Sequence, residues 1–121
     1  MKSITAEVII VGAGLAGLVA AQVLQNKGIN VSVMDKSTSV GGRMATRRIG
    51  TGVADHGAQF FTVRDPKFQA MVDDWVAQDI VSVWAYGFSD GSLVTAPTDG
   101  HPRYIARGGM NALTKHLASG L

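Results

Sequence analysis

The protein has 121 residues, of which 46% are apolar and 17% are charged, and its net charge is +2. This length allows one compact domain with a modest core, and the composition excludes a disordered chain. The absence of cysteine excludes disulfides, thiolate metal sites and a cysteine nucleophile, and the small positive charge excludes a polybasic nucleic-acid surface.

An apolar stretch near the N-terminus, residues 8–21, resembles a signal peptide only superficially. Glu7 interrupts its approach, and Gln22 closes it well short of the length that a membrane span needs. The three histidines are too scattered to form a metal site. We therefore expect a soluble, cytoplasmic protein with no membrane partner and no bound metal.

The first elements form a βαβ unit. Residues 6–11 are a short β-branched apolar run, which is typical of a buried parallel strand. Residues 14–27 place their apolar positions on one helical face, and Gly28 follows as a C′ cap. Residues 30–34 predict a second strand. The pattern indicates an α/β fold that begins with a Rossmann-like unit.

Two extended segments and a helix follow. Gly41-Gly42 marks a turn, and residues 44–49 and 53–61 are predicted to be extended and joined through residues 50–52. Asp65-Pro66 is a helix start, with aspartate as the N-cap and proline at the first helical position. The apolar stripe of this helix consists of Phe68, Met71, Val72, Trp75 and Val76.

The last segment combines a hairpin with a helix. Residues 81–86 alternate as a strand does, and Asp90-Gly91 predicts a hairpin turn that leads to residues 93–94. Residues 103–106 are a short extended piece. A final helix is entered through Gly108-Gly109, and its apolar face contains Met110, Leu113, Thr114 and Leu117.

Residues 12–17 carry the chemistry, because they spell GxGxxG between a predicted strand and a predicted helix. The first glycine permits a tight turn, the second lets the backbone approach a pyrophosphate, and the third allows close packing of helix on strand. Unpaired N–H groups at the helix start favour phosphate. The motif predicts a dinucleotide site.

Asp35 strengthens this prediction, since it ends the second strand about twenty residues after the glycines. A carboxylate there accepts hydrogen bonds from both ribose hydroxyls and repels a 2′-phosphate. Gly41-Gly42-Arg43 then adds a close turn and a guanidinium that can bind a phosphate. This second element favours FAD over NAD, although a nicotinamide-dependent dehydrogenase stays open as an alternative.

Longer stretches resemble a known family. The segments VGAGLAG, DKS, GGRMATRR, ADHGAQFFTVRDPKF and APTDGHPRYIARGGMNAL are similar to the flavin-containing amine oxidase superfamily, and within it to bacterial renalase-like proteins. The resemblance covers nearly the whole chain but only the early part of the family's usual length. It implies the start of a two-domain fold, with a dinucleotide-binding core over about 1–62 and the first substrate-domain elements over about 63–121.

The resemblance also implies site residues, with FAD bound non-covalently. The contacts to the pyrophosphate would be Gly12, Ala13, Gly14, Ala16 and Gly17. The other cofactor contacts would be Asp35 and Lys36 at the adenosine ribose, Arg43 and Met44 along the phosphate and ribityl chain, and Gln59 and Phe60 at the isoalloxazine ring. The substrate contacts would be Phe60, Phe61, Thr62, Val63, Arg64, Ala96, Pro97 and Thr98.

No catalytic residue is assigned. His56 lies beside the proposed flavin segment, but the family passes hydride directly to the flavin, so a positional role is expected for it. Arg64 could meet a substrate phosphate or carboxylate, or it could fix the loop before Asp65.

The resemblance implies an FAD-dependent oxidoreductase that passes electrons through flavin to oxygen. Its substrates would be isomeric dihydro-nicotinamide dinucleotides in the renalase-like branch, and amines in the wider superfamily. Because these 121 residues lack most of the family's substrate domain, we expect this chain to be a truncated gene product or one piece of a longer protein. A non-catalytic dinucleotide-binding module is the alternative from another class, and the sequence is silent on oligomeric state.

Overall fold

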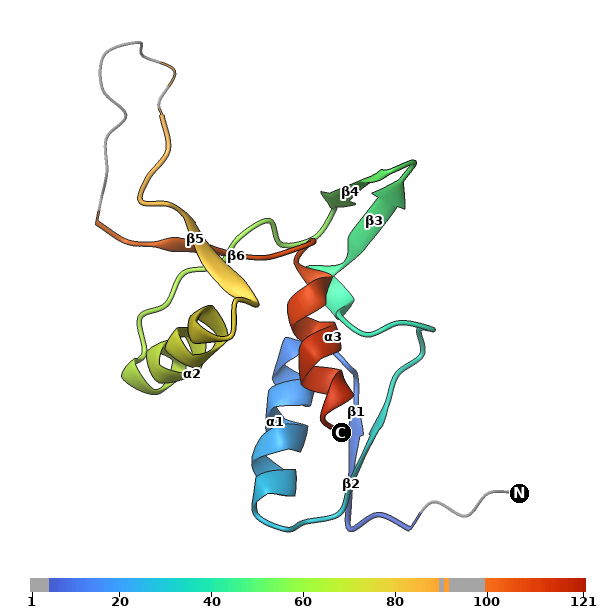
Figure 1. Cartoon of the computed structure of the whole chain (residues 1–121). Coiled ribbons are helices and arrows are strands. Elements are labelled where there is room, and N and C mark those ends of the chain that lie inside the picture. Colours follow the sequence, from blue (N-terminus) through green and yellow to red (C-terminus); the bar gives the residue numbers. More distant parts are fainter. Residues whose placement is uncertain (1–4, 90, 92–99) are drawn as a thin grey trace.

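A computed structural model describes residues 5–89, 91 and 100–121 of the chain (Figure 1). Within them, helices alternate with three two-stranded sheets, of which one is parallel and two are antiparallel. The fold is therefore mixed α/β with a Rossmann-like start, as the sequence predicted.

The N-terminal βαβ unit consists of β1 (Val8–Val11), α1 (Leu15–Asn26) and β2 (Val31–Met34). The two strands pair in parallel. Gly28 has a φ of +78°, its N–H donates to Gln25 O, and the N–H of Ile29 donates to Leu24 O. These bonds form a Schellman motif, so the predicted glycine cap is confirmed and turns the chain directly into β2.

A short 3-10 helix, η1 (Gly42–Met44), and a hairpin of β3 (Thr46–Ile49) and β4 (Gly52–Asp55) come next. The sequence prediction was wrong at both ends of this region. Met44 is not extended, because its N–H closes a turn onto Gly41 O. The second strand ends at Asp55 rather than at residue 61, because Thr46, the partner of Asp55, is already the first residue of β3.

A second group of elements contains α2 (Pro66–Ala77), β5 (Val81–Ala85) and β6 (Arg103–Ala106). The Asp65 carboxylate accepts from the N–H of Phe68 at 2.9 Å, which confirms the predicted N-cap. β5 pairs with β6 in antiparallel register. The predicted hairpin turn and its continuation at residues 93–94 lie partly or wholly outside the described residues.

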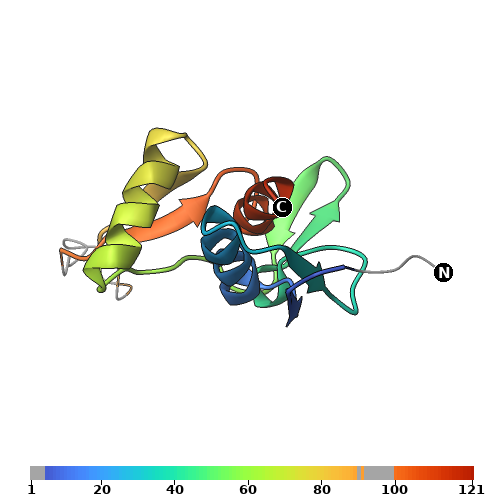
Figure 2. The ribbon, with the colours of Figure 1, turned by 90° about the horizontal axis from the view of Figure 1, so that it is seen from below.

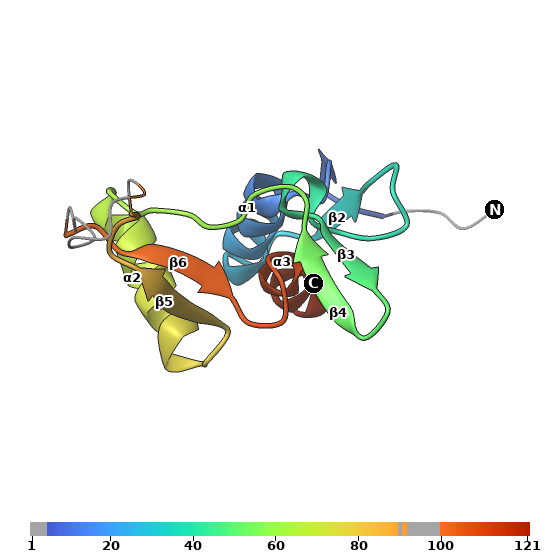
Figure 3. The same ribbon diagram turned by 90° about the horizontal axis from the view of Figure 1, so that it is seen from above.

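The last helix, α3 (Asn111–Ser119), returns to the βαβ unit and packs against α1 (Figures 1 and 2). Figure 3 shows the same pair from the opposite side, with α2 and the β5–β6 hairpin at one end of the molecule. Among the described residues, the largest of the almost wholly buried side chains are those of Leu18, Met110, Leu113, Leu117, Val72, Val81 and Thr114. The division at residue 62 stays a prediction, but α3 lies on the dinucleotide-binding unit and not apart from it.

Candidate functional site

The glycine-rich loop joins β1 to α1 and is held by backbone bonds on two sides. Gly12 has a φ of +108°, and its N–H donates to Met34 O at 2.7 Å. Ala13 O accepts from the N–H of Gly41 at 2.9 Å, and Gly14 bridges to Gly41. The loop is therefore fixed between the end of β2 and the second glycine turn.

The glycines of the loop differ in what surrounds them. A Cβ on Gly17 would collide with the carbonyl oxygen of Gly12 and lie 3.3 Å from Ile10 Cγ2. A Cβ on Gly12 or Gly14 would meet no atom within 4 Å. Gly17 thus allows α1 to pack closely on β1, whereas Gly12 and Gly14 leave open space through which a ligand can reach the backbone.

The start of α1 suits an anion. Gly14 is the N-cap, no side chain caps the helix, and its first turn contains no acidic residue. The first N–H groups of a helix have no partner within the helix, and they carry the positive end of its dipole. With open space above Gly14, this end of α1 fits the phosphates of a dinucleotide.

Asp35 lies directly after β2 and bonds back to the loop. Its Oδ2 accepts from the N–H of Ala13 at 2.7 Å, and its Oδ1 accepts from the N–H of Ser37 at 2.7 Å. The bond from Ala13, and then that from Ser37, lowers the pKa of this carboxyl below its ordinary value. The carboxylate is exposed, and each oxygen keeps a lone pair for a ribose hydroxyl.

The second glycine turn, Gly41 to Met44, crosses the loop at close range. Gly41 and Gly42 have φ values of +126° and +54°, and a Cβ on Gly42 would lie 3.6 Å from Gly14 Cα. The carbonyl oxygen of Arg43 accepts from the N–H of Ala58 at 2.8 Å. Arg43 is exposed and Met44 is buried, so only the guanidinium is free to reach toward solvent and ligand.

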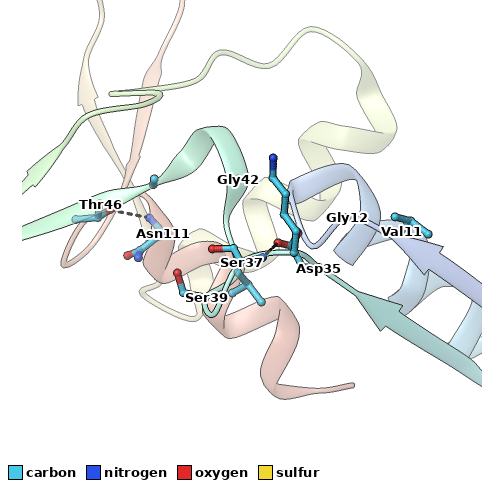
Figure 4. A pocket seen from close by; sticks show the side chains of 11 residues that line it. Val11, Gly12, Asp35, Ser37, Ser39, Gly42, Thr46 and Asn111 are labelled. Carbon is cyan, nitrogen blue, oxygen red and sulfur yellow. Dashed lines mark hydrogen bonds between the residues drawn. The ribbon is translucent and has the colours of Figure 1, made fainter. Parts of the chain in front are cut away.

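Two cavities meet at Gly12. The smaller one, about 480 Å³, has a polar wall that includes Asp35, Lys36, Ser37 and Asn111 (Figure 4). The larger one, about 630 Å³, is mainly apolar, and its lining includes Gly14, Ala16, Gly17, Arg43, Met44, Phe61 and Phe68. Both volumes lie in the range of small-molecule sites. Eight of the residues predicted to hold the cofactor therefore line two adjoining cavities, namely Gly12, Gly14, Ala16, Gly17, Asp35, Lys36, Arg43 and Met44. A ninth, Ala13, lines neither cavity, but its N–H donates to Asp35.

The remaining predicted contacts are spread over a wider surface. Gln59 lines a separate cavity of about 470 Å³ together with Trp84. Phe60 belongs to an exposed aromatic cluster, with ring centroids 6.2 Å from Trp84 and 5.2 Å from Phe88. Phe61 instead turns toward the protein and stacks on Tyr104 at 5.5 Å. The structure therefore separates the neighbouring side chains of Phe60 and Phe61.

The other predicted substrate contacts give less information. Thr62, Val63 and Arg64 form the irregular segment between Phe61 and α2, and Thr62 and Arg64 are exposed. Ala96, Pro97 and Thr98 lie outside the described residues. His56 is exposed, and its backbone N–H donates to Ala45 O at 3.3 Å.

Sequence reasoning missed a polar group that connects the hairpin to α3. The Thr46 hydroxyl donates to Asp55 Oδ1 at 2.6 Å, and the N–H of Met110 donates to the same oxygen at 2.8 Å. The N–H of Asn111 donates to Thr46 Oγ1 at 3.1 Å. Thr46 and Asn111 both line the smaller cavity. These bonds cap the start of α3. The sequence around α3 does not predict this cap, because Met110 and Asn111 are 55 and 65 residues away from their partners Asp55 and Thr46.

The described part of the chain contains neither a membrane-spanning helix nor a cluster of metal ligands. Over residues 5–89, 91 and 100–121, no helix has both the length and the apolar character needed to cross a membrane. In the same residues, no three histidine, aspartate or glutamate side chains come together as a metal site would require.

Comparison with known proteins agrees with this geometry. Residues 10–75 match the family described as NAD(P)-binding Rossmann-like domain. The chain is 36% identical over 67 residues to protoporphyrinogen oxidase 2 of Arabidopsis thaliana, and this match covers 55% of this chain and 13% of that protein. It is 45% identical over 56 residues to a flavin-containing monoamine oxidase of Mycobacterium tuberculosis, AofH, described as putative, covering 46% of this chain and 12% of that protein.

A solved structure has a similar fold. Putrescine oxidase bound to putrescine superposes with a TM-score of 0.56 at 30% sequence identity, over 73% of this chain and 19% of that one. The chain thus spans less than a fifth of the length of these relatives.

Proposed function

The chain belongs to the family of NAD(P)-binding Rossmann-like domains, and from this premise we propose that it is the FAD-binding part of a flavin-dependent oxidoreductase. One observation carries the proposal. The glycine loop, Asp35 and the second glycine turn, which are separate in the sequence, surround two cavities that meet at Gly12.

Different residues of the chain would bind different parts of FAD. The open start of α1 binds the pyrophosphate through backbone N–H groups, and Asp35 accepts from the ribose hydroxyls. A 2′-phosphate would meet the negative charge of Asp35, so an unphosphorylated ribose is favoured. Arg43 supplies a positive charge beside the phosphates.

FAD is favoured over NAD because of the second glycine turn. Gly41 and Gly42 bring η1 against the glycine loop, and Arg43 extends from that contact into the larger cavity. A nicotinamide site does not need this element. A relative described as a flavin-containing monoamine oxidase supports the same choice. We propose that FAD is held non-covalently, with Gln59 and Phe60 next to its ring.

The bound flavin would accept a hydride from the substrate and pass its electrons to oxygen. We propose a renalase-like activity in a cytoplasmic enzyme, with isomeric dihydro-nicotinamide dinucleotides as substrates. The resemblance that supports this choice lies in residues 54–68 and 96–113. The second candidate is an amine oxidase, which is favoured by the structural similarity to putrescine oxidase. In either case Phe60–Arg64 and Ala96–Thr98 would touch the substrate.

Anaerobic reduction of the flavin separates these candidates. The FAD-loaded chain is mixed with dihydro-nicotinamide isomers or with putrescine, and the flavin absorption is followed. The proposal predicts bleaching by a dihydro-nicotinamide dinucleotide and recovery of the colour when oxygen is admitted. Bleaching by putrescine alone would assign the chain to an amine oxidase.

A further inference from the structure

The first residue of α3, Asn111, lies in the wall of the smaller cavity and has a fixed backbone. Its N–H donates to Thr46 Oγ1, and the preceding N–H, of Met110, donates to Asp55 Oδ1. The hydroxyl of Thr46 bonds to the same Asp55 oxygen at 2.6 Å. Because this cap holds the start of α3 against the hairpin, the side chain of Asn111 is presented to the cavity from a rigid support.

The amide of Asn111 is available to a ligand. Neither its oxygen nor its nitrogen hydrogen-bonds to another residue within the part of the chain that the structure describes, and the residue is half-buried. Figure 4 shows Asn111 beside Thr46, with Ser39, Ser37 and then Asp35 farther along the same cavity. A half-buried amide gains most when both its donor and its acceptor are used.

The position of Asp35 orients the ligand, an argument that rests on the proposed function. If Asp35 binds the ribose, the pyrophosphate extends toward Gly12 and the start of α1. The base then extends the other way, toward Asn111. On that side Val40 and Ala45 provide apolar surface for a flat ring, and Asn111 provides a polar group for its edge.

We propose that Asn111 recognises the adenine base. The N6 amino group of adenine donates and its N7 accepts, which matches the carbonyl and the amino group of an asparagine side chain. Guanine has two acceptors at the same edge, O6 and N7, so the Asn111 carbonyl would face an acceptor and lose its partner. Asn111 is thus a specificity-determining residue that selects an adenine-containing ligand.

Competition between nucleotides tests this role. FAD bound to the full chain is displaced by ADP or by GDP, and the flavin fluorescence is followed. A matched amide–adenine pair is worth about 1–3 kcal/mol, so ADP should compete about tenfold or more better than GDP. In Asn111→Ala this preference should fall by about tenfold. Lys115→Ala, an exposed change on the same helix, should keep it.

Asn111→Asp is the second variant, because it keeps the size of the side chain and adds an acid to the first turn of α3, where acids favour the helix. It keeps an acceptor for the N6 amino group but lacks the N–H donor for N7, so ADP should bind more weakly than it does to the wild type and still bind better than GDP, which offers only acceptors at that edge. The melting temperature of this variant shows whether α3 is intact. An ADP preference that is unchanged in Asn111→Ala, or absent in the wild type, would overturn the role of Asn111 alone, and so would an unchanged affinity for ADP in Asn111→Asp. A wild-type chain that binds no FAD would contradict the proposed function and this inference together.

Discussion

At the scale of single residues, the glycines of the loop have different tasks although they share one motif. Gly17 is enclosed by Gly12 and Ile10, so it is needed for packing. Gly14 faces open space and has an extended backbone, with φ −78° and ψ 178°, which alanine can also adopt. The binding chemistry of the loop and the stability of the fold can therefore be separated experimentally.

Gly17→Ala should destabilise the protein, whereas Gly14→Ala should mainly weaken cofactor binding. The new methyl group at position 17 meets a backbone oxygen that cannot rotate away, and such overpacking costs about 1–3 kcal/mol. At position 14, alanine lowers the conformational entropy of the unfolded chain, which stabilises the folded protein by about 0.4–1 kcal/mol. This gain offsets the loss from alanine being a poorer N-cap than glycine. Urea unfolding and FAD titration of both variants measure the two effects. Equal losses of stability would contradict this division.

The ionised carboxylate of Asp35 should stabilise the folded protein at neutral pH but not in strong acid. Its pKa is lowered in the folded protein, so its contribution is present above the unfolded value of about 3.9 and is lost as the pH falls through the lower folded value. The difference in melting temperature between wild type and Asp35→Asn should therefore shrink in strong acid. Lys36→Ala keeps both N–H bonds to the carboxylate and removes only the charge of Lys36, the smallest of the causes that lower the pKa of Asp35, so it should retain most of the acid dependence of the wild type. If the difference in melting temperature between wild type and Asp35→Asn stays constant with pH, the bonds from Ala13 and Ser37 to the carboxylate do not stabilise the fold.

At the scale of elements, the ends of the helices show what local sequence can specify. Asp65 caps α2 and Gly28 closes α1, and both were predicted, because each cap uses residues only a few positions away. The cap of α3 was not predicted, because Thr46 and Asp55 come from a distant hairpin. Met44 was predicted in the wrong conformation, because two consecutive glycines with positive φ start a turn that apolar alternation does not reveal.

Asp79 ends α2 in a conformation that favours glycine, since its φ is +62°. The N–H groups of Asp79 and Ile80 donate to Val76 O and Trp75 O, so it occupies the C′ position of a Schellman motif. Its ion pair with Arg107, at 3.1 Å, is exposed and contributes little.

Asp79→Gly should therefore be more stable than Asp79→Ala by about 1 kcal/mol, as measured by thermal unfolding. Both variants lose the ion pair equally, so the comparison isolates the backbone. An alanine variant as stable as the glycine variant would mean that the helix end relaxes.

At the scale of the whole molecule, the site depends on chain segments that are far apart in the sequence. The βαβ unit and Asp35 could be predicted because strand and helix periodicity and the glycine spacing are local. The packing of α3 on α1 could not be predicted, because it depends on how distant surfaces fit together. The same holds for the close approach of Gly41 to α3, where a Cβ at position 41 would lie 3.1 Å from Thr114 Oγ1. The pairing of β5 with β6 is long-range in the same sense.

Titration of the purified chain with FAD, FMN and NAD, followed by ultrafiltration, tests the central claim most directly. The cavity around Asp35 and the start of α1 holds the adenosine and pyrophosphate in this account, so FAD should be retained stoichiometrically and FMN, which lacks the adenosine half, should pass through. Gly14→Ala should reduce the retention of FAD. Retention of NAD with FAD passing freely through the membrane would contradict the account and assign the site to a nicotinamide cofactor.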